Sequence, residues 1–220
     1  MNTMSGRAVA AKRTRKLIFT DPAWEDRFDQ LILLTQRTAL IQEITGTDLR
    51  SQRIKEEIDR RYGEMGEEVN RPRGVGRDYT SKTFISSKTD KYDAAYLIAL
   101  HFGSRGAGEY AEAETNLAKA CDKRLAVYNK YRSDYYSWGV EPRISFESYY
   151  LMVQGIKERA IEVHQCGDCN SRYPVSASHQ GQSTCPVCSI QDLRMDNANL
   201  LIEERLAAKR AATEQTYKFG

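Results

Sequence analysis

The sequence predicts a mainly α-helical protein, in which a multi-helix body carries a helix-turn-helix-like N-terminal part and a small C-terminal four-cysteine ribbon. Two observations predict the helices. Apolar residues recur at helical spacing along most of the chain, and glycines and prolines stand between the periodic segments. A third observation, two CxxC pairs near the C-terminus, predicts the ribbon. The chain has 220 residues, enough for one or two small domains with a sizeable core.

The composition excludes several classes of protein. No stretch of about 18 uninterrupted apolar residues exists, and the mean hydropathy is -0.63, so we expect a soluble protein with no membrane partner. No apolar segment of secretory length follows the basic residues of the N-terminus, so we expect a cytoplasmic protein. The net charge is only +3, so any argument for nucleic acid must come from where the charges lie.

Residues 1–20 are small, polar and basic, and we expect them to form a flexible arm. This arm is either a solvated terminus or a segment that contacts phosphate groups. Asp21 followed by Pro22 predicts a helix start, because the Asp carboxylate can accept backbone amide hydrogen bonds while proline fits the first turn. From Trp24 onward, apolar spacing predicts one long helix or two abutting helices, ended by Gly46.

A second helix, capped by Thr47, is expected to complete a helix-turn-helix-like region over residues 21–65. Its outer faces carry polar and basic residues, Arg60 and Arg61 among them. Four residues near its start are candidates for contacts with DNA, namely Arg50, Gln52, Arg53 and Lys55. Position 42 is Gln where a small residue usually lets two such helices approach. Two unrelated amphipathic helices would give a similar pattern.

Residues 66–88 form a basic segment rich in glycine. The segment is either a plain linker or a phosphate-contacting loop, because glycines let backbone amides approach the phosphodiester and arginines supply positive charge. Its candidate DNA contacts are Arg71, Arg73, Arg77 and Lys82.

Residues 89–163 are predicted to form a helical core. One helix spans residues 89–102, a second follows from Glu109, and a third begins at a Ser145 cap and continues through Val163 into the cysteine motif. The second helix carries a stripe of tyrosines at helical spacing. These rings could stack on bases, but we interpret them as core or interface residues.

Residues 164–190 contain the most specific pattern, two CxxC pairs separated by fifteen residues: Cys166, Cys169, Cys185 and Cys188. A hairpin that includes a strand over residues 171–175 can bring the pairs together into a tetrahedral thiolate site for one Zn2+ ion, which makes this a zinc ribbon. His164 and His179 could replace a thiolate, although a surface role fits them better.

Four thiolates leave no open position for water or substrate, so we expect the zinc to be structural. The sequence also lacks a convergent nucleophile and base, so we expect neither an enzyme nor a small-molecule substrate. A redox role fits less well than zinc, because thioredoxin-type CxxC motifs occur singly.

The order of these parts resembles FlhC, the transcriptional activator subunit of the flagellar master regulator, and its relatives on conjugative elements. The resemblance runs over residues 31–188. Its most specific stretch is residues 149–175, YYLMVQGIKERAIEVHQCGDCNSRYPV, where a helix enters the cysteine knuckle, and residues 33–65 are a weaker match. The basic arm and the C-terminal helix or tail, residues 191–220, lie outside the matched region.

The resemblance implies zinc on the four cysteines and double-stranded promoter DNA as the ligand, which would place the protein at the nucleoid. It also implies a hetero-oligomer with an FlhD-like subunit and recruitment of RNA polymerase. A second hypothesis is a DksA-type zinc protein that binds RNA polymerase directly without contacting DNA. Proteins of that type carry acidic residues at a coiled-coil tip, whereas the turn over residues 103–108 has no pair of aspartates.

Overall fold

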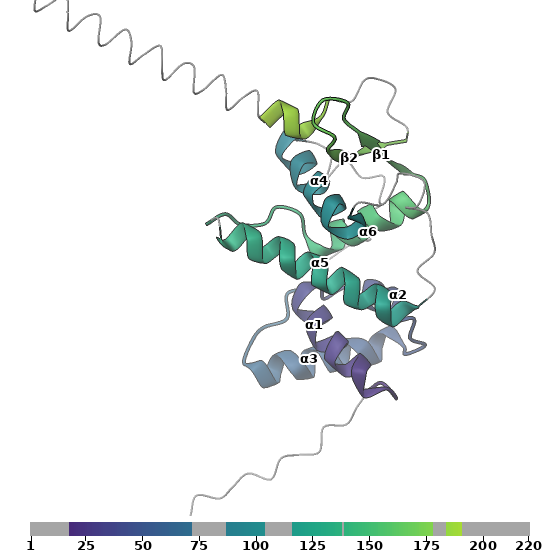
Figure 1. The fold of residues 1–220 in the computed structure, drawn as a ribbon. Coiled ribbons are helices and arrows are strands. Elements are labelled where there is room, and N and C mark those ends of the chain that lie inside the picture. The colour runs from purple at the N-terminus through teal and green to yellow at the C-terminus, as the bar shows by residue number, and fades with distance from the viewer. Residues whose placement is uncertain (1–17, 72–86, 104–115, 138, 178–183, 191–220) are drawn as a thin grey trace, which may run out of the picture.

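The computed structural model describes residues 18–71, 87–103, 116–137, 139–177 and 184–190, and within them the protein is mainly helical, as predicted (Figure 1). The elements are α1 Pro22–Leu34, α2 Thr38–Thr45, α3 Ser51–Met65, α4 Lys88–Phe102, α5 Leu117–Ser137, α6 Phe146–Lys157, β1 Ile161–Gln165 and β2 Arg172–Ser176. Residues 186–190 add a short helical turn. Helices α1 to α3 form one end of the molecule and the two strands lie at the other. In the described ranges, no helix has the length and apolar character needed to cross a bilayer.

Helices α1, α2 and α3 pack around a small apolar core of their own. Asp21 caps α1, its Oδ1 accepting a hydrogen bond from the Ala23 amide at 2.9 Å, and Pro22 occupies the first turn, so the predicted helix start is confirmed. The apolar stretch that follows forms two helices, because the chain leaves helical geometry between Leu34 and Thr38. The buried apolar residues of this core are Phe28, Ile32, Ile41, Ile54, Ile58 and Tyr62.

The turn between α2 and α3 is shaped by Gly46 and held by Gln42. Gly46 ends α2, as predicted, with a φ of 61°, a left-handed conformation that glycine adopts without strain. Gln42 Nε2 donates to the Leu49 carbonyl at 2.7 Å, and Ser51 Oγ donates to Gln42 Oε1 at 2.9 Å. The Gln42 side chain therefore fastens the turn. The prediction that Thr47 caps α3 is wrong, because α3 begins at Ser51.

Arg61 lies inside the α1 to α3 unit, so the prediction that it occupies an outer face is wrong. Its side chain is 3% exposed and forms ion pairs with Glu25, Asp29 and Glu57, with Nε 2.7 Å from Glu57 Oε1. Burial alone would raise the pKa of Glu57, but hydrogen bonds from Arg60 and Arg61 bring it below its ordinary value. Arg61 thus joins α3 to α1 through charges that would be costly to bury without partners.

The tyrosine stripe of α5 lies in the main core, as predicted. Tyr128, Tyr131 and Tyr135 are all buried in the cluster that also contains residues of α4 and α6. The hydroxyls of Tyr131 and Tyr135 both donate to the carboxylate of Asp93 on α4, the Tyr131 bond being 3.0 Å long. Burial raises the pKa of Asp93 above its ordinary value despite these two hydrogen bonds. Helices α4 and α5 are therefore joined by polar as well as apolar contacts.

Helix α6 begins at its predicted serine cap but ends earlier than predicted. It stops at Lys157, whereas the sequence predicted a helix through Val163. Arg159 adopts a φ of 60°, and the Ala160 amide donates back to the Gly155 carbonyl at 2.8 Å, which closes the helix in a Schellman motif. The chain leaves the motif in a new direction and cannot continue the helix.

The residues after this motif form the first strand of the ribbon. β1 pairs with β2 in an antiparallel register that runs from Ile161 opposite Ser176 to Gln165 opposite Arg172. The strand predicted over residues 171–175 is therefore confirmed as β2, to within a residue at each end. β-branched residues at alternate positions of β1 suit a strand, which is the physical reason that the helix prediction fails here.

Replacing Gly46 by alanine is expected to destabilise the protein by about 1–2 kcal/mol. An added Cβ would lie 2.5 Å from Leu117 Cδ1, and the new residue would keep a φ of 61°. Gly63→Ala is the matched control, because it lies inside α3 with nothing within 4 Å of the added Cβ, and it should stabilise the protein by about 0.5–1 kcal/mol. Urea unfolding of the full chain measures both effects. Equal effects of the two substitutions would contradict the role assigned to Gly46.

Replacing Arg61 by alanine is expected to lower the free energy of unfolding by about 3–5 kcal/mol, because Glu25 and Glu57 would stay buried without their cation. Arg53→Ala removes an exposed arginine from the same helix and should change stability by less than about 0.5 kcal/mol. Denaturant titrations followed by circular dichroism compare the two variants. A loss below about 1 kcal/mol for Arg61→Ala would show that the buried network contributes little net stability.

Candidate metal centre and nucleic-acid interface

The four cysteines are presented by two tight turns of the ribbon. Cys166 directly follows β1, and the chain reverses over Cys169 and Asn170 before β2 begins. Asn170 has a φ of 57°, a left-handed conformation that asparagine tolerates, and its amide donates to the Cys166 carbonyl at 3.0 Å. On the C-terminal side, Cys185 directly precedes the short helical turn and Cys188 lies within it. Both turns match the knuckles that the CxxC spacing predicts.

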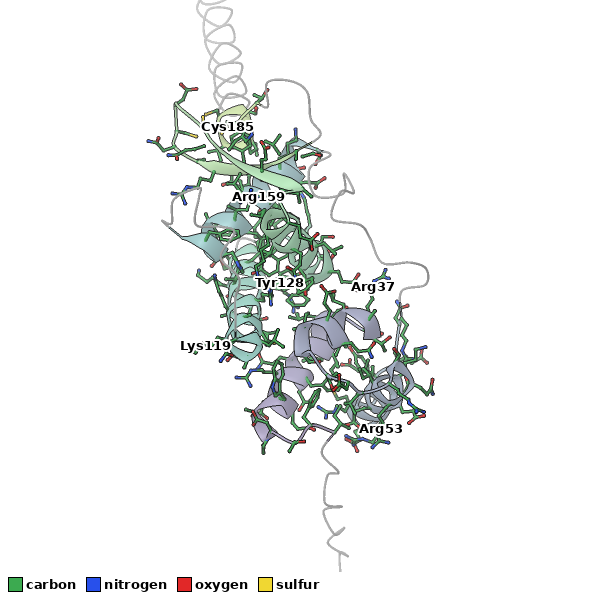
Figure 2. All side chains as sticks on the ribbon, turned by 90° about the vertical axis from the view of Figure 1, so that its right-hand side faces the viewer. Arg37, Arg53, Lys119, Tyr128, Arg159 and Cys185 are labelled. Carbon is green, nitrogen blue, oxygen red and sulfur yellow. The ribbon has the colours of Figure 1, made fainter. Side chains whose placement is uncertain are left out.

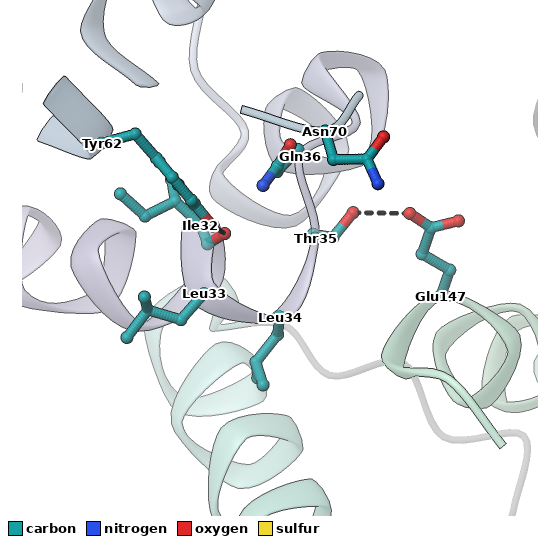
Figure 3. Close-up of a pocket in the computed structure, with 8 residues that line it drawn as sticks. All are labelled: Ile32, Leu33, Leu34, Thr35, Gln36, Tyr62, Asn70 and Glu147. Atoms are coloured by element: carbon teal, nitrogen blue, oxygen red, sulfur yellow. Dashed lines mark hydrogen bonds between the residues drawn. The ribbon is translucent and has the colours of Figure 1, made fainter. Parts of the chain in front are cut away.

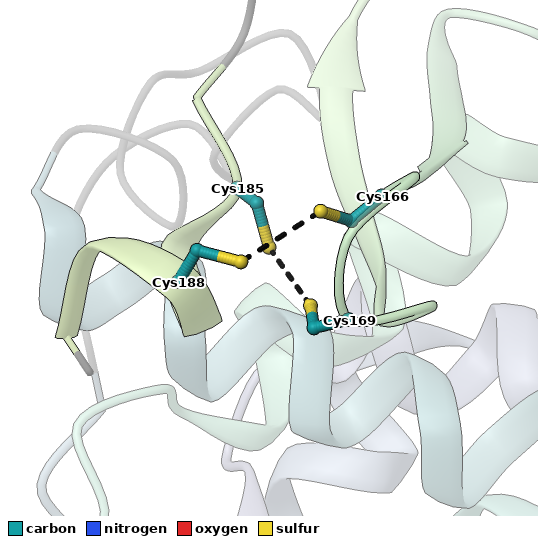
Figure 4. A group of neighbouring side chains, drawn as sticks. All are labelled: Cys166, Cys169, Cys185 and Cys188. Atoms are coloured by element: carbon teal, nitrogen blue, oxygen red, sulfur yellow. Dashed lines mark hydrogen bonds between the residues drawn. The ribbon is translucent and has the colours of Figure 1, made fainter. Parts of the chain in front are cut away.

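The four sulfur atoms converge on one point (Figure 4). All four Sγ atoms lie within 4.8 Å of one another. The Sγ atoms of Cys166 and Cys188 are 3.8 Å apart, and those of Cys169 and Cys185 are 3.6 Å apart, so each close contact joins the two pairs. A tetrahedron with metal–sulfur distances of about 2.3 Å has edges of about 3.8 Å. The four cysteines could therefore hold one metal ion.

The surroundings of the sulfurs favour deprotonation of one thiol in particular. Hydrogen bonds from the side chain and backbone of Ser171 lower the pKa of Cys169 to about 6. The pKa of Cys188 is raised, mainly by its hydrogen bond with Cys169, and burial raises the pKa of Cys185. A bound cation would displace the protons held at these two sulfurs. Sequence analysis does not identify Ser171, although its place two residues after Cys169 is where a hydroxyl can reach the thiolate.

His164 does not belong to the sulfur cluster. Its Nε2 lies 3.1 Å from Glu162 Oε2 on the same strand, and its ring centre is 6.1 Å from that of Tyr173. In the part of the chain that the structure describes, the candidate metal ligands are the four cysteines. His179 falls outside the described residues.

The cysteine cluster is seated on helix α4. Tyr173 and Val175 of β2 are buried together with Cys166 and Cys185 against Ala95 of α4. The guanidinium of Arg172 donates to the carbonyl of Gly103, at the C-terminal end of α4, at 3.1 Å. A change in the metal site would therefore alter the contacts that α4 makes with the ribbon.

The residues predicted to contact DNA fall into three groups. Arg50, Gln52, Arg53 and Lys55 are exposed at the N-terminal end of α3. Arg71 instead folds back onto α3, with Nη2 2.5 Å from Asp59 Oδ1 and 3.0 Å from the Lys55 carbonyl. Arg73, Arg77 and Lys82 lie outside the described residues. Figure 2 places Arg53 and Cys185 toward opposite ends of the molecule, so the basic end of α3 and the cysteine cluster are separate sites.

An open pocket of about 450 Å³ lies where the connection between α1 and α2 meets α6 (Figure 3). It is lined by Ile32, Leu33, Leu34, Thr35, Gln36, Tyr62, Asn70 and Glu147. Thr35 Oγ1 donates to Glu147 Oε1 at 2.8 Å, and Arg37 Nε donates to Glu147 Oε2 at 2.6 Å. Both carboxylate oxygens are thus engaged in holding the α1–α2 connection against α6. We therefore interpret this pocket as part of the packing between the α1–α2 connection and α6, and not as a ligand site.

No protein-family model matches this sequence, and no curated protein matches it. The interpretation of the cysteine cluster and of α3 therefore rests on their ligand chemistry, burial and charge.

The purified, reduced full chain is expected to contain one metal ion per molecule, and elemental analysis distinguishes zinc from iron, the two metals that four thiolates select. Cys169→Ala and Cys188→Ala should each lose the ion. Cys121→Ala is the matched control, because Cys121 is buried in the main core, away from the cluster, and this variant should keep it.

Removing the metal with a chelator should increase amide hydrogen exchange across β1 and β2 more than across α5, because a two-stranded sheet with five residues in each strand is marginal in water. Full protection of the ribbon in metal-free protein would contradict a structural metal site.

Proposed function

We propose that this chain is a zinc-containing, DNA-binding transcriptional activator of the FlhC type. In this proposal it is one subunit of a hetero-oligomer with an FlhD-like partner, which binds double-stranded promoter DNA in the cytoplasm and recruits RNA polymerase. The observation that carries the proposal is the exposed, basic N-terminal end of α3 in a helix-turn-helix arrangement.

Zinc is the ion proposed for the cysteine cluster because thiolate sulfur is a soft ligand, and four thiolates at tetrahedral spacing are typical of structural zinc sites. All four positions of such an ion would be filled by protein. The proposed role of the ion is therefore to hold the ribbon on α4, and the proposed function does not include catalysis.

The shape of the α2 and α3 pair supports binding to a duplex. Helix α2 has 8 residues and α3 has 15, and they are joined by a turn that Gly46 and Gln42 fix. In helix-turn-helix proteins the second helix lies in the major groove, and residues near its N-terminal end contact the DNA. Ile54 and Ile58 anchor the opposite face of α3 in the core, so the exposed residues are carried by a rigid element.

The charge at this end of α3 also supports binding to a duplex. Arg50, Arg53 and Lys55 are exposed within one and a half turns. Cations arranged in this way release counterions when they reach phosphate groups, and this release makes affinity fall as salt rises. The three exposed cations at this end of α3 therefore favour binding to a duplex.

The test is a gel-shift titration of the full, zinc-loaded chain against duplex DNA at several salt concentrations. We expect the triple variant Arg50→Glu, Arg53→Glu and Lys55→Glu to abolish binding, because three attractive contacts with phosphates become repulsive. Single alanine variants should each lower the slope of log affinity against log salt by about one.

The matched control reverses the same number of exposed cations elsewhere, in Lys119→Glu, Lys130→Glu and Arg159→Glu. It has the same net charge as the α3 variant and should retain most of the affinity. Equal losses in the two triple variants would remove α3 from the interface. Binding to purified RNA polymerase without any binding to duplex DNA would favour the DksA-type alternative.

A further inference from the structure

Gln52 and Glu56 lie at the centre of the exposed face of α3. The buried residues of this helix are Ile54, Glu57, Ile58, Arg61 and Tyr62. Successive residues of a helix are rotated by about 100°, so the line opposite the buried face carries Gln52 and Glu56, which are four residues apart. Gln52 Nε2 donates to Glu56 Oε1 at 3.2 Å. The centre of the exposed face is therefore a pair of hydrogen-bonding groups rather than a cation.

Arg53 and Lys55 lie on the two flanks of this pair. Their positions differ by about 160° around the helix, so one cation stands on each side of the line of Gln52 and Glu56. The side chain of Arg53 is 46% exposed, and its Nη1 is 3.9 Å from Glu56 Oε2. Lys55 is also exposed. The two cations therefore lie on opposite sides of α3, with the polar pair Gln52 and Glu56 between them.

The next residue along the central line is Asp59, and its charge is offset within the protein. Arg71 Nη2 lies 2.5 Å from Asp59 Oδ1, and the side chain of Arg71 is 32% exposed. Glu56 differs from Asp59 in this respect. Among the described residues, no arginine from another segment pairs with Glu56, which lies between the exposed cations Arg53 and Lys55. A carboxylate at that place would oppose binding to phosphates in general.

We propose that Gln52 and Glu56 contact base edges when α3 lies in the major groove, while Arg53 and Lys55 bind the phosphates on either side of the groove. This inference rests on the proposed function. A glutamine amide matches the N6 and N7 atoms of adenine, and a glutamate accepts a hydrogen bond from the N4 amino group of cytosine. Guanine and thymine present no donor in the major groove, so opposite either of them the Glu56 carboxylate would be left without a partner, and it gives specificity by penalising those bases.

The test is selection from a random duplex library by the full, zinc-loaded chain, followed by sequencing of the bound fraction. The wild type should enrich a motif. Glu56→Gln should lower the preference for cytosine at one base pair about tenfold or more and raise binding to random duplex at low salt. Gln52→Ala should lose a preference for adenine at a neighbouring base pair. Arg53→Ala and Lys55→Ala should weaken binding to every sequence without changing the motif.

Glu64→Gln is the matched control, because it removes one exposed acid from the same helix beyond the proposed contact region. Its selected motif should equal that of the wild type. A wild-type motif that survives both Gln52→Ala and Glu56→Gln would overturn the inference and leave DNA binding in place. Binding to duplex without any enriched motif would overturn it as well. A wild-type chain that binds no duplex at any salt concentration would instead remove the proposed function itself.

Discussion

Four cysteine sulfurs that meet within 4.8 Å are the contact on which the C-terminal end of this protein depends. β1 and β2 have only five residues each, and a two-stranded sheet of that size is marginal in water. Tyr173 and Val175 lie on α4 beside two of these cysteines, so the position of the ribbon on the helical body follows from the same convergence. Four thiols would keep most of their protons, whereas a shared cation would replace them and hold both turns.

The two ends of the molecule are connected through α5. At one end of this helix, Arg27 of α1 donates to Asp122 with a 2.7 Å bond between Nε and Oδ1, and this hydrogen bond lowers the pKa of the Asp122 carboxyl. At the other end, Tyr131 and Tyr135 donate to Asp93 of α4, which carries the ribbon. In each of these contacts a carboxylate accepts hydrogen bonds from another helix. Removing either partner would leave the other without its hydrogen bond. The helix-turn-helix and the cysteine cluster are therefore held in a defined relation although they lie far apart (Figure 2).

Local sequence patterns predict the elements and the cysteine cluster, and they fail where distant residues decide the outcome. The CxxC spacing predicts a metal site whenever one hairpin brings the two pairs together. The apolar periodicity of a helix depends only on the residues of that helix. Arg61 has the same neighbours in sequence as an exposed arginine, and its burial depends on Glu25 and Asp29 of another helix. Val163 continues an apolar helical pattern, but its pairing opposite Pro174 in the antiparallel ribbon decides that it lies in a strand. Gln42 occupies a position where a small residue is usual in a helix-turn-helix. Its side chain makes two hydrogen bonds to the turn, which a shorter side chain could not make.

The basic residues of the sequence are a poor guide to the positive surface, because folding assigns many of them to acidic partners. Arg27, Arg37, Arg61 and Arg71 all pair with carboxylates on other segments of the chain. Their charges hold helices together and contribute little to an external field, since each is offset at close range. Arg53 and Lys55 remain exposed at one end of α3, where the neighbouring acid is on the same helix. A net charge of only +3 is therefore compatible with a local group of exposed cations, because the sum over the chain does not say where those cations lie.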